Sequence, residues 1–182
     1  MNDRGGHSRT ITTGVGRTGT ENQPSPSRRA HAATAAGVFS IALLVYLLTV
    51  APTVPFWDAG EYITTAATLG IPHPPGSPLL SLTGRVMSLL PLYDFRGGGL
   101  EHIAFRVNCI AVLSGAFSVL LLYLLSVRFI TRFSPLTGRL RRDFPVFAAG
   151  AVSALTAGFA PQFWENAVEV ETYLPSLMLS LL

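Results

Sequence analysis

The sequence contains no lysine, and all 13 of its basic residues are arginine. We attribute this bias mainly to the codon usage of a high-G+C genome. Charge is scarce as well, since charged residues make up 13% of the chain, against about 25% in a typical soluble domain. Hydrophobic residues reach 49% and the mean hydropathy is +0.43, which indicates a membrane protein.

Several motifs that carry chemistry in other proteins are also missing. Cys109 is the single cysteine, which excludes an intrachain disulfide. There is no cysteine–histidine zinc spacing, no phosphate-binding glycine loop, no dinucleotide-binding glycine motif and no G-x-S-x-G nucleophile motif. The arginines are not interleaved with aromatic residues, so nucleic acid is not an expected partner.

The first 50 residues divide into a polar tail and an apolar segment. Residues 1–31 are rich in Gly, Ser, Thr and Arg without apolar periodicity, which predicts a disordered tail. The 19 residues from Ala32 to Val50 carry no charge. At about 1.5 Å per residue they reach roughly 28 Å, enough to cross a bilayer's hydrocarbon core. We predict the first membrane crossing here, ended by Pro52.

Further apolar segments predict three more crossings, at 103–130, at 145–163 and from 173 onward. We therefore predict an all-α, polytopic membrane fold over residues 32–182. The chain stops within an apolar run, so we interpret it as the N-terminal part of a longer protein. We do not expect this part to be active alone.

The external loop at 52–101 is predicted to hold two short helices, over 58–69 and 76–90, with Gly97, Gly98 and Gly99 as a flexible link. The second helix has a polar stripe and an opposite apolar side. The stripe contains Ser77, Ser81, Arg85 and Ser88, and the apolar side contains Leu79, Leu82, Val86 and Leu89. Such a helix is too short and too polar to span, so we predict that it lies flat on the membrane surface.

The charges predict the orientation of these segments. The tail carries five arginines and the 128–143 loop carries five more, so ten of the 13 arginines fall on one side. The segments on the other side carry seven acidic residues and three arginines. Because positive charge marks the cytoplasmic side, we expect a cytoplasmic N-terminus and external acidic loops. We expect a multi-pass protein of a bacterial cell membrane.

Asp58 and Glu61 are the first candidate catalytic residues. Their spacing of three places both carboxylates on one helix face. One interpretation is a capping box, with Asp58 at the N-cap. The other is functional, because an ionised pair near a bilayer needs water, a cation or a substrate. Trp57 and Tyr62 would hold the pair at headgroup depth, where a carboxylate could accept a proton from a hydroxyl.

The string from His73 to Gly76, His-Pro-Pro-Gly, predicts a stiff turn. It is either a hinge between two surface helices or a device that aims His73 at the carboxylates or at a phosphate. Arg106, near the outer end of a crossing, is either a residue that snorkels to headgroups or a cation for a lipid phosphate. Arg85 is a second candidate for that cation.

Glu171 lies just before Tyr173, where the fourth crossing begins. Glu171 is either a solvated helix end or a residue that faces the same external cavity as Asp58. We count both Glu171 and Tyr173 as candidate substrate-binding residues.

Two strings of the external loop resemble a known family. The strings are APTV with FWDAGE, at 51–54 and 56–61, and HPPGSPL, at 73–79. Weaker matches continue in FRVN at 105–108, in Phe163-Trp164 and in Glu171-Thr172-Tyr173. Together they resemble the opening of a multi-pass family that was long a domain of unknown function. It is now grouped with GT-C glycosyltransferases, and its animal member is a protein O-mannosyltransferase. The resemblance covers residues 45–182.

The resemblance implies a GT-C membrane fold and an inverting transfer of a sugar, such as mannose, from a polyprenyl-phosphate carrier. The acceptor would be a hydroxyl of a protein or glycan on the non-cytoplasmic side. By position, Asp58 would be the general base, and Glu61 would be its helper or a group that orients the acceptor. Arg106, and next His73, would stabilise the departing phosphate.

Other functions remain open at this point. The resemblance implies a lipid-linked sugar donor but no certain cofactor. A divalent metal is possible, but it would need further ligands. Membrane lipids are expected partners. The chain could also belong to a transporter or flippase for a lipid-linked glycan, with Asp58 and Glu61 as its cation site. A non-enzymatic membrane scaffold is the third alternative.

Overall fold

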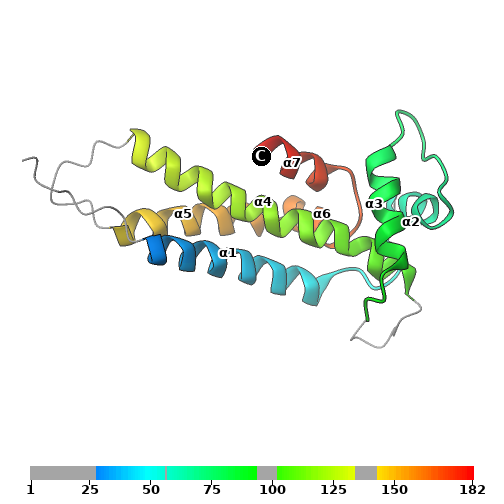
Figure 1. The fold of residues 1–182 in the computed structure, drawn as a ribbon, viewed down its shortest axis with the longest axis horizontal. Coiled ribbons are helices and arrows are strands. Elements are labelled where there is room, and N and C mark those ends of the chain that lie inside the picture. The colour runs from blue at the N-terminus through cyan, green and yellow to red at the C-terminus, as the bar shows by residue number, and fades with distance from the viewer. Residues whose placement is uncertain (1–27, 56, 94–101, 134–142) are drawn as a thin grey trace, which may run out of the picture.

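The computed structural model describes residues 28–55, 57–93, 102–133 and 143–182, and its regular elements are all α-helices (Figure 1). They are α1 (Arg28–Thr49), α2 (Ala59–Thr68), α3 (Pro78–Leu89), α4 (Ile103–Phe133), α5 (Asp143–Gly158), α6 (Pro161–Val168) and α7 (Tyr173–Leu181). The predicted all-α membrane fold is confirmed.

Two helices are long and apolar enough to cross a bilayer. α1 has 22 residues and α4 has 31, which correspond to about 33 Å and about 46 Å. α4 is therefore longer than the hydrocarbon core of about 30 Å. Its first turns extend past the end of α1 and carry the layer formed by α2 and α3 (Figure 1). This extension places the acidic loop at one end of the bundle.

α1, α4 and α5 pack together through apolar side chains and glycines. Tyr46 and Val119 are fully buried in this core. The Tyr46 hydroxyl donates a hydrogen bond to the carbonyl of Gly158 over 2.6 Å. A Cβ at Gly158 would lie 2.5 Å from Val119, and one at Gly150 would lie 2.7 Å from Val127. Small residues thus allow α5 to approach α4 closely, as is common between membrane helices.

The predicted third crossing, over 145–163, is not a single straight helix. α5 ends at Gly158, and α6 begins at Pro161 after a bend of 69°. Pro161 has no N–H to donate into a preceding turn, but it is well suited to the first position of a new helix. α5 and α6 together form either one broken span or a re-entrant segment.

The first helix begins earlier than predicted. Residues 28–31 were assigned to the tail, but α1 starts at Arg28. The rest of the predicted tail, the Gly97–Gly99 link and Arg139, Arg141 and Arg142 lie outside the described residues.

α2 and α3 form a small layer across the start of α4. A Cβ at Gly84 would lie 2.6 Å from that of Ala66, so α3 and α2 are in close contact. The polar stripe of α3 faces this contact, with Ser81 and Ser88 buried. The opposite side is exposed, and its members are Leu79, Leu82, Val86 and Leu89. An apolar helix face that points away from the protein suits a lipid surface, and the location of α3 on the membrane stays a prediction.

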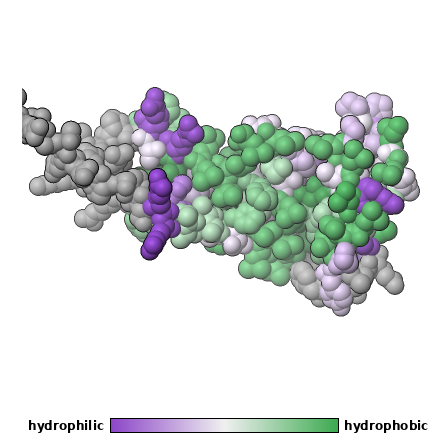
Figure 2. Space-filling model, in the orientation of Figure 1, coloured by the Kyte–Doolittle hydropathy of each residue, from purple (hydrophilic) through white to green (hydrophobic). Residues whose placement is uncertain are grey.

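Opposite charges gather at opposite ends of the described bundle. Arg28 and Arg29 begin α1, and Arg128 and Arg132 lie in the last turns of α4. The start of α1 and the end of α4 lie at the same end of the bundle (Figure 1). Asp58 and Glu61 lie at the other end, at the start of α2. On the face shown in Figure 2, hydrophilic residues gather toward both ends and hydrophobic ones cover the middle.

Candidate functional site

Asp58 and Glu61 are positioned by the first turn of α2. Asp58 occupies the N-cap position, and its carbonyl accepts the N–H of Tyr62 over 3.0 Å. Its carboxylate makes no capping hydrogen bond, so the capping-box interpretation is wrong. Trp57, just before it, has a φ of 67° and is 91% exposed. The side chain of Asp58 thus remains available for other contacts.

Glu61 holds His73 at two points. One carboxylate oxygen accepts the backbone N–H of His73 over 2.7 Å, and the other lies 2.7 Å from ring Nδ1. The His-Pro-Pro-Gly string closes as a turn, in which the Gly76 N–H donates to the His73 carbonyl over 2.9 Å. Gly76 has a φ of 77°, a conformation that favours glycine. The turn and Glu61 together fix the position of the imidazole.

This pairing changes the ionisation of both groups. The hydrogen bonds from His73 lower the pKa of Glu61 below its ordinary value of 4.5. The same contact, with the charges of Glu61, Asp58 and Glu171, raises the pKa of His73 above 6.5. Glu61 therefore favours a protonated, cationic His73 at neutral pH.

Asp58 lies on the other side of the imidazole. His73 Nε2 is 3.9 Å from a carboxylate oxygen of Asp58. The Asp58 side chain is 58% exposed and that of His73 is 43% exposed. Glu61, His73 and Asp58 thus form a compact cluster whose three side chains are all partly open to solvent.

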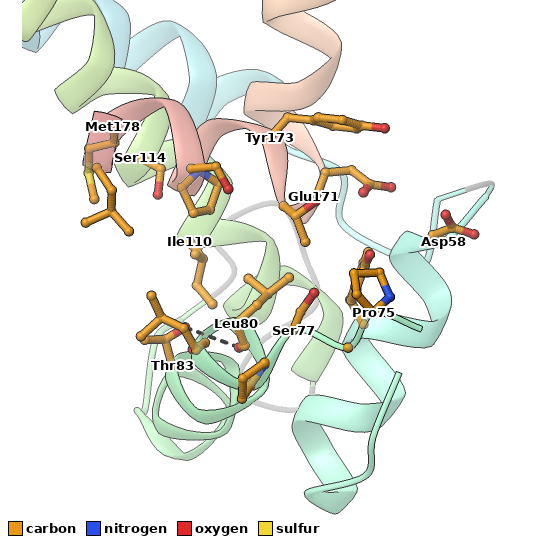
Figure 3. Close-up of a pocket in the computed structure, with 18 of the residues that line it drawn as sticks. Asp58, Pro75, Ser77, Leu80, Thr83, Ile110, Ser114, Glu171, Tyr173 and Met178 are labelled. Carbon is orange, nitrogen blue, oxygen red and sulfur yellow. Dashed lines mark hydrogen bonds between the residues drawn. The ribbon is translucent and has the colours of Figure 1, made fainter. Parts of the chain in front are cut away.

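A cavity of about 690 Å³ opens beside this cluster (Figure 3). Asp58 and His73 line it from the α2 side, and Glu171 and Tyr173 line it from the chain between α6 and α7. Its other end, between α3, α4 and α7, is lined by Leu80, Ile110, Ser114 and Met178. Figure 3 shows Asp58 and Glu171 on one side of this space and Ser114 and Met178 on the other. The cavity thus has an acidic end and a mainly apolar end.

The structure brings Glu171 to the same cavity as Asp58, although the two lie 113 positions apart. Burial and the charge of Asp58 raise the pKa of Glu171 above 4.5. A partly buried carboxyl beside another carboxylate is typical of sites that bind polar ligands or move protons.

Tyr62 is a site residue that the sequence interpretation placed at the headgroups. It is 7% exposed and lines the cavity, with its ring centroid 5.9 Å from that of His73. Burial and the charge of Glu171 raise the pKa of its hydroxyl above 10.0. Tyr62 lies four residues after Asp58, so helical spacing alone could have predicted that both share one face.

Arg85 and Arg106, the predicted phosphate ligands, do not line the cavity. Arg85 donates to the carbonyl of Ala67 over 2.5 Å, near the end of α2. Arg106 donates to the carbonyl of Leu90 over 3.1 Å, at the end of α3. Both arginines thus satisfy carbonyls at helix C-termini, where cations are favourable. His73 is the cationic candidate that the structure brings to the cavity.

The cluster also has the donor atoms for a metal ion. Asp58, Glu61 and His73 each offer one ligand atom within 4.8 Å of the others. Ring Nδ1 of His73 already contacts Glu61, so an ion would bind ring Nε2 or replace the contact with Nδ1. The divalent metal stays a prediction.

Residues 58–182 match the family described as the protein O-mannosyl-transferase TMEM260 N-terminal domain. The chain is 31% identical to mouse protein O-mannosyl-transferase TMEM260 over 146 residues, which are 80% of this chain and 18% of that protein. It is 23% identical to the protein of the same name from Dictyostelium discoideum over 137 residues, 75% of this chain and 14% of that protein. No solved structure matches the chain. The chain spans less than a fifth of the length of these relatives.

Proposed function

The chain belongs to the TMEM260 N-terminal domain family, and from this premise we propose that it carries the catalytic loop of a membrane glycosyltransferase. The enzyme transfers a sugar, mannose in the first instance, from a polyprenyl-phosphate carrier to a hydroxyl of a protein or glycan. The relatives' names support the mannosyl transfer. The carrier and the roles below rest on the chemistry of the cavity.

The observation that carries this proposal is the convergence of Asp58, His73 and Glu171 on one cavity. A base, a cation and a second carboxyl are the groups that a transfer from a sugar phosphate to a hydroxyl needs. The apolar end of the cavity, between α3, α4 and α7, suits the hydrocarbon part of a lipid carrier.

In the proposed reaction, Asp58 accepts the proton of the acceptor hydroxyl. The acceptor oxygen attacks the anomeric carbon, and the bond from that carbon to the phosphate oxygen breaks. The electron pair of the broken bond stays on the phosphate, which leaves as an anion. A single displacement of this kind inverts the anomeric centre. Because a phosphate leaving group is a weak base, the reaction needs no general acid.

Protonated His73 stabilises the negative charge that develops on the phosphate. Glu61 contributes indirectly, because it keeps His73 cationic and fixes the position of its ring. Glu171 and Tyr173 lie across the cavity and bind the acceptor. Glu61 is thus a positioning residue, whereas Asp58 is a catalytic one.

The arrangement of charges supports a site on the non-cytoplasmic side. The described arginines of α1 and of the last turns of α4 lie at the end opposite Asp58. By the positive-inside rule that end is cytoplasmic. The same arrangement disfavours a transporter, whose carboxylates lie near the bilayer midplane, whereas Asp58 lies beyond the end of α1.

A transfer assay tests the proposal. Membranes that contain the full-length protein receive radiolabelled polyprenyl-phosphate mannose, and the label that reaches protein is counted. Asp58→Asn should lower transfer by at least about 100-fold, because general base catalysis contributes about 10²–10⁴-fold. Glu165→Gln, an exposed carboxylate of α6 that does not line the cavity, is the matched control.

Protein amount should be equal in wild type, Asp58→Asn and the control. Equal transfer by wild type and Asp58→Asn would remove Asp58 as the base. Normal transfer together with a loss of lipid-linked glycan movement across the membrane would favour the transporter.

A further inference from the structure

Asn108 is a fully buried polar residue in the second turn of α4. Its side-chain Nδ2 donates to the carbonyl of Ala51 over 2.9 Å and lies 3.4 Å from that of Thr53. Its Oδ1 accepts the backbone N–H of Val170 over 3.0 Å. Both ends of the amide are therefore used, each by a different segment of the chain.

The two segments that Asn108 contacts lead to two different walls at the acidic end of the cavity. Ala51 and Thr53 belong to the link between α1 and α2, which continues to Asp58. Val170 directly precedes Glu171. A direct hydrogen bond, from the Ala51 N–H to the Val168 carbonyl over 2.8 Å, joins the same two segments.

The first segment has few means of holding its position by itself. Pro52 and Pro55 lack an N–H, and the link follows α1, which ends at Thr49. A buried amide that satisfies carbonyls of one segment and an N–H of the other fixes their separation. Its loss would leave buried backbone groups unpaired, which is costly.

We infer that Asn108 is a positioning residue that sets the distance between the wall with Asp58 and His73 and the wall with Glu171. Its catalytic consequence rests on the proposed function. A shift of about 1 Å between reacting groups can lower a rate by about 100-fold. Asn108 therefore controls turnover without contact to substrate.

Two variants and one control test this inference in the full-length protein. Asn108→Leu keeps the approximate volume and removes every side-chain hydrogen bond. Asn108→Asp keeps the acceptor oxygen, and its protonated form can also donate. Ser118→Ala is the control, because Ser118 is fully buried in the same helix and its hydroxyl has no hydrogen-bond partner within the described residues.

The first readout is geometric and does not depend on the reaction. Spin labels at Ile71→Cys, between α2 and α3, and at Gln162→Cys, on α6, report the distance between the elements that adjoin the two walls, and both positions are exposed. Cys109 is buried and stays in place. We expect one narrow distance distribution in the otherwise wild-type protein and in Ser118→Ala, and a broader one in Asn108→Leu. An unchanged distribution in Asn108→Leu would overturn the inference.

The second readout is kinetic. We expect kcat to fall at least about tenfold in Asn108→Leu, with the KM for the lipid-linked sugar changed less than about threefold. For Asn108→Asp, the ratio of its kcat to the wild-type kcat at the same pH should rise toward one as the pH falls from 8 to 6. The reason is that its buried carboxyl becomes protonated over this range.

The kinetic results also separate this inference from the proposed function. A normal kcat in Asn108→Leu, despite a broader distribution, would overturn the catalytic role of Asn108. A broader distribution together with normal transfer by Asp58→Asn would instead remove the proposed role of Asp58 and leave the positioning role in place. If Asn108→Leu does not accumulate in membranes, the same readouts on Asn108→Asp at pH 8 decide the question.

Discussion

The two halves of α4 share apolar packing but differ in their polar contacts. From about Val112 onward, the helix packs against α1 and α5 through buried apolar side chains and close contacts at Gly150 and Gly158. In its first turns, Asn108 and Arg106 hydrogen-bond to backbone carbonyls of neighbouring segments. The first turns also pack against α2 and α3, with Val107 buried there, but within the described residues they alone of these two halves add side-chain hydrogen bonds to the backbone of neighbouring segments.

Because of this difference, we expect the apolar half of α4 to affect the stability of the protein and the cavity to affect transfer. Close packing in the apolar half tolerates little change in volume. At the other end, the pair of His73 and Glu61 is about 40% exposed, and exposed ion pairs contribute little to stability. Substitutions in the apolar half should therefore change the amount of folded protein. Substitutions at the cavity should change transfer by each folded molecule.

The largest effect on transfer in this comparison is expected for His73→Gln. Loss of the cation should lower transfer by about 100-fold. This is the lower end of the rate effects seen when a group that stabilises a developing anion is removed. The measurement is transfer from the lipid-linked sugar, normalised to folded protein. His31→Gln is the control, because His31 lies on α1 against Tyr123 and Phe147. A similar loss in both variants would contradict the separation between the two ends.

The next effect is expected in the apolar half, for Gly158→Ala. The added Cβ would lie 2.5 Å from Val119, and overpacking of this kind costs about 1–3 kcal/mol. The amount of folded protein and its thermal midpoint should fall, while transfer by each folded molecule stays constant. Gly37→Ala is the control, since nothing lies within 4 Å of a Cβ there. Unchanged thermal midpoints in both variants would contradict the described α4–α5 contact.

A smaller effect is expected for Glu61→Gln, in the dependence of transfer on pH. Glu61 raises the pKa of His73, so its charge stabilises the protonated imidazole. This contribution to stability is present below pH 6.5 and is lost as the pH rises through the raised pKa of His73. The contribution of Glu61 is present above pH 4.5 and is lost as the pH falls through its own lowered pKa.

In Glu61→Gln the pKa of His73 should return toward 6.5, and the alkaline limb of transfer should move to lower pH. At a pH between the His73 pKa of Glu61→Gln and that of the wild type, transfer by the variant should fall by up to about tenfold for each pH unit. The measurement is transfer between pH 5.5 and 9. An alkaline limb that does not move would show that protonated His73 is not required.

The smallest effect is expected for Arg106→Gln. Its described contact is with the Leu90 carbonyl at the end of α3, and such contacts are worth about 0.3–1 kcal/mol. Thermal stability should fall slightly, and transfer by each folded molecule should stay within about threefold of wild type. A loss as large as that of His73→Gln would restore Arg106 as the ligand of the phosphate.

Long apolar runs predicted the spanning helices well, because length and composition decide whether a helix can cross a bilayer. α1 and α4 follow the predicted segments with small shifts at their ends. The break before Pro161 was missed, although proline at that position is a local signal. The two short helices of the external loop were predicted from their prolines and glycines, and they occur as α2 and α3.

The candidate site was predictable where its residues are close in sequence. The spacing of Asp58 and Glu61 and the stiff turn at His73 are local features. The partners of Arg85 and Arg106 were not predictable, because helix C-terminal carbonyls are present throughout the chain and only the fold selects one. Asn108 was missed for the same reason, since its contacts join residues 57 and 62 positions away.

The central claim is that the lipid-linked sugar occupies the cavity beside His73 from the non-cytoplasmic side. Ser77 lines this cavity, whereas Ile71 lies on the same loop outside it and is 89% exposed. The decisive measurement is labelling of Ser77→Cys and Ile71→Cys by a membrane-impermeant maleimide in sealed vesicles, with and without polyprenyl-phosphate mannose. We predict that the maleimide labels both positions from the non-cytoplasmic side. The donor should slow the labelling of Ser77→Cys and leave that of Ile71→Cys unchanged. Labelling from the cytoplasmic side, or no protection of Ser77→Cys by the donor, would contradict the account.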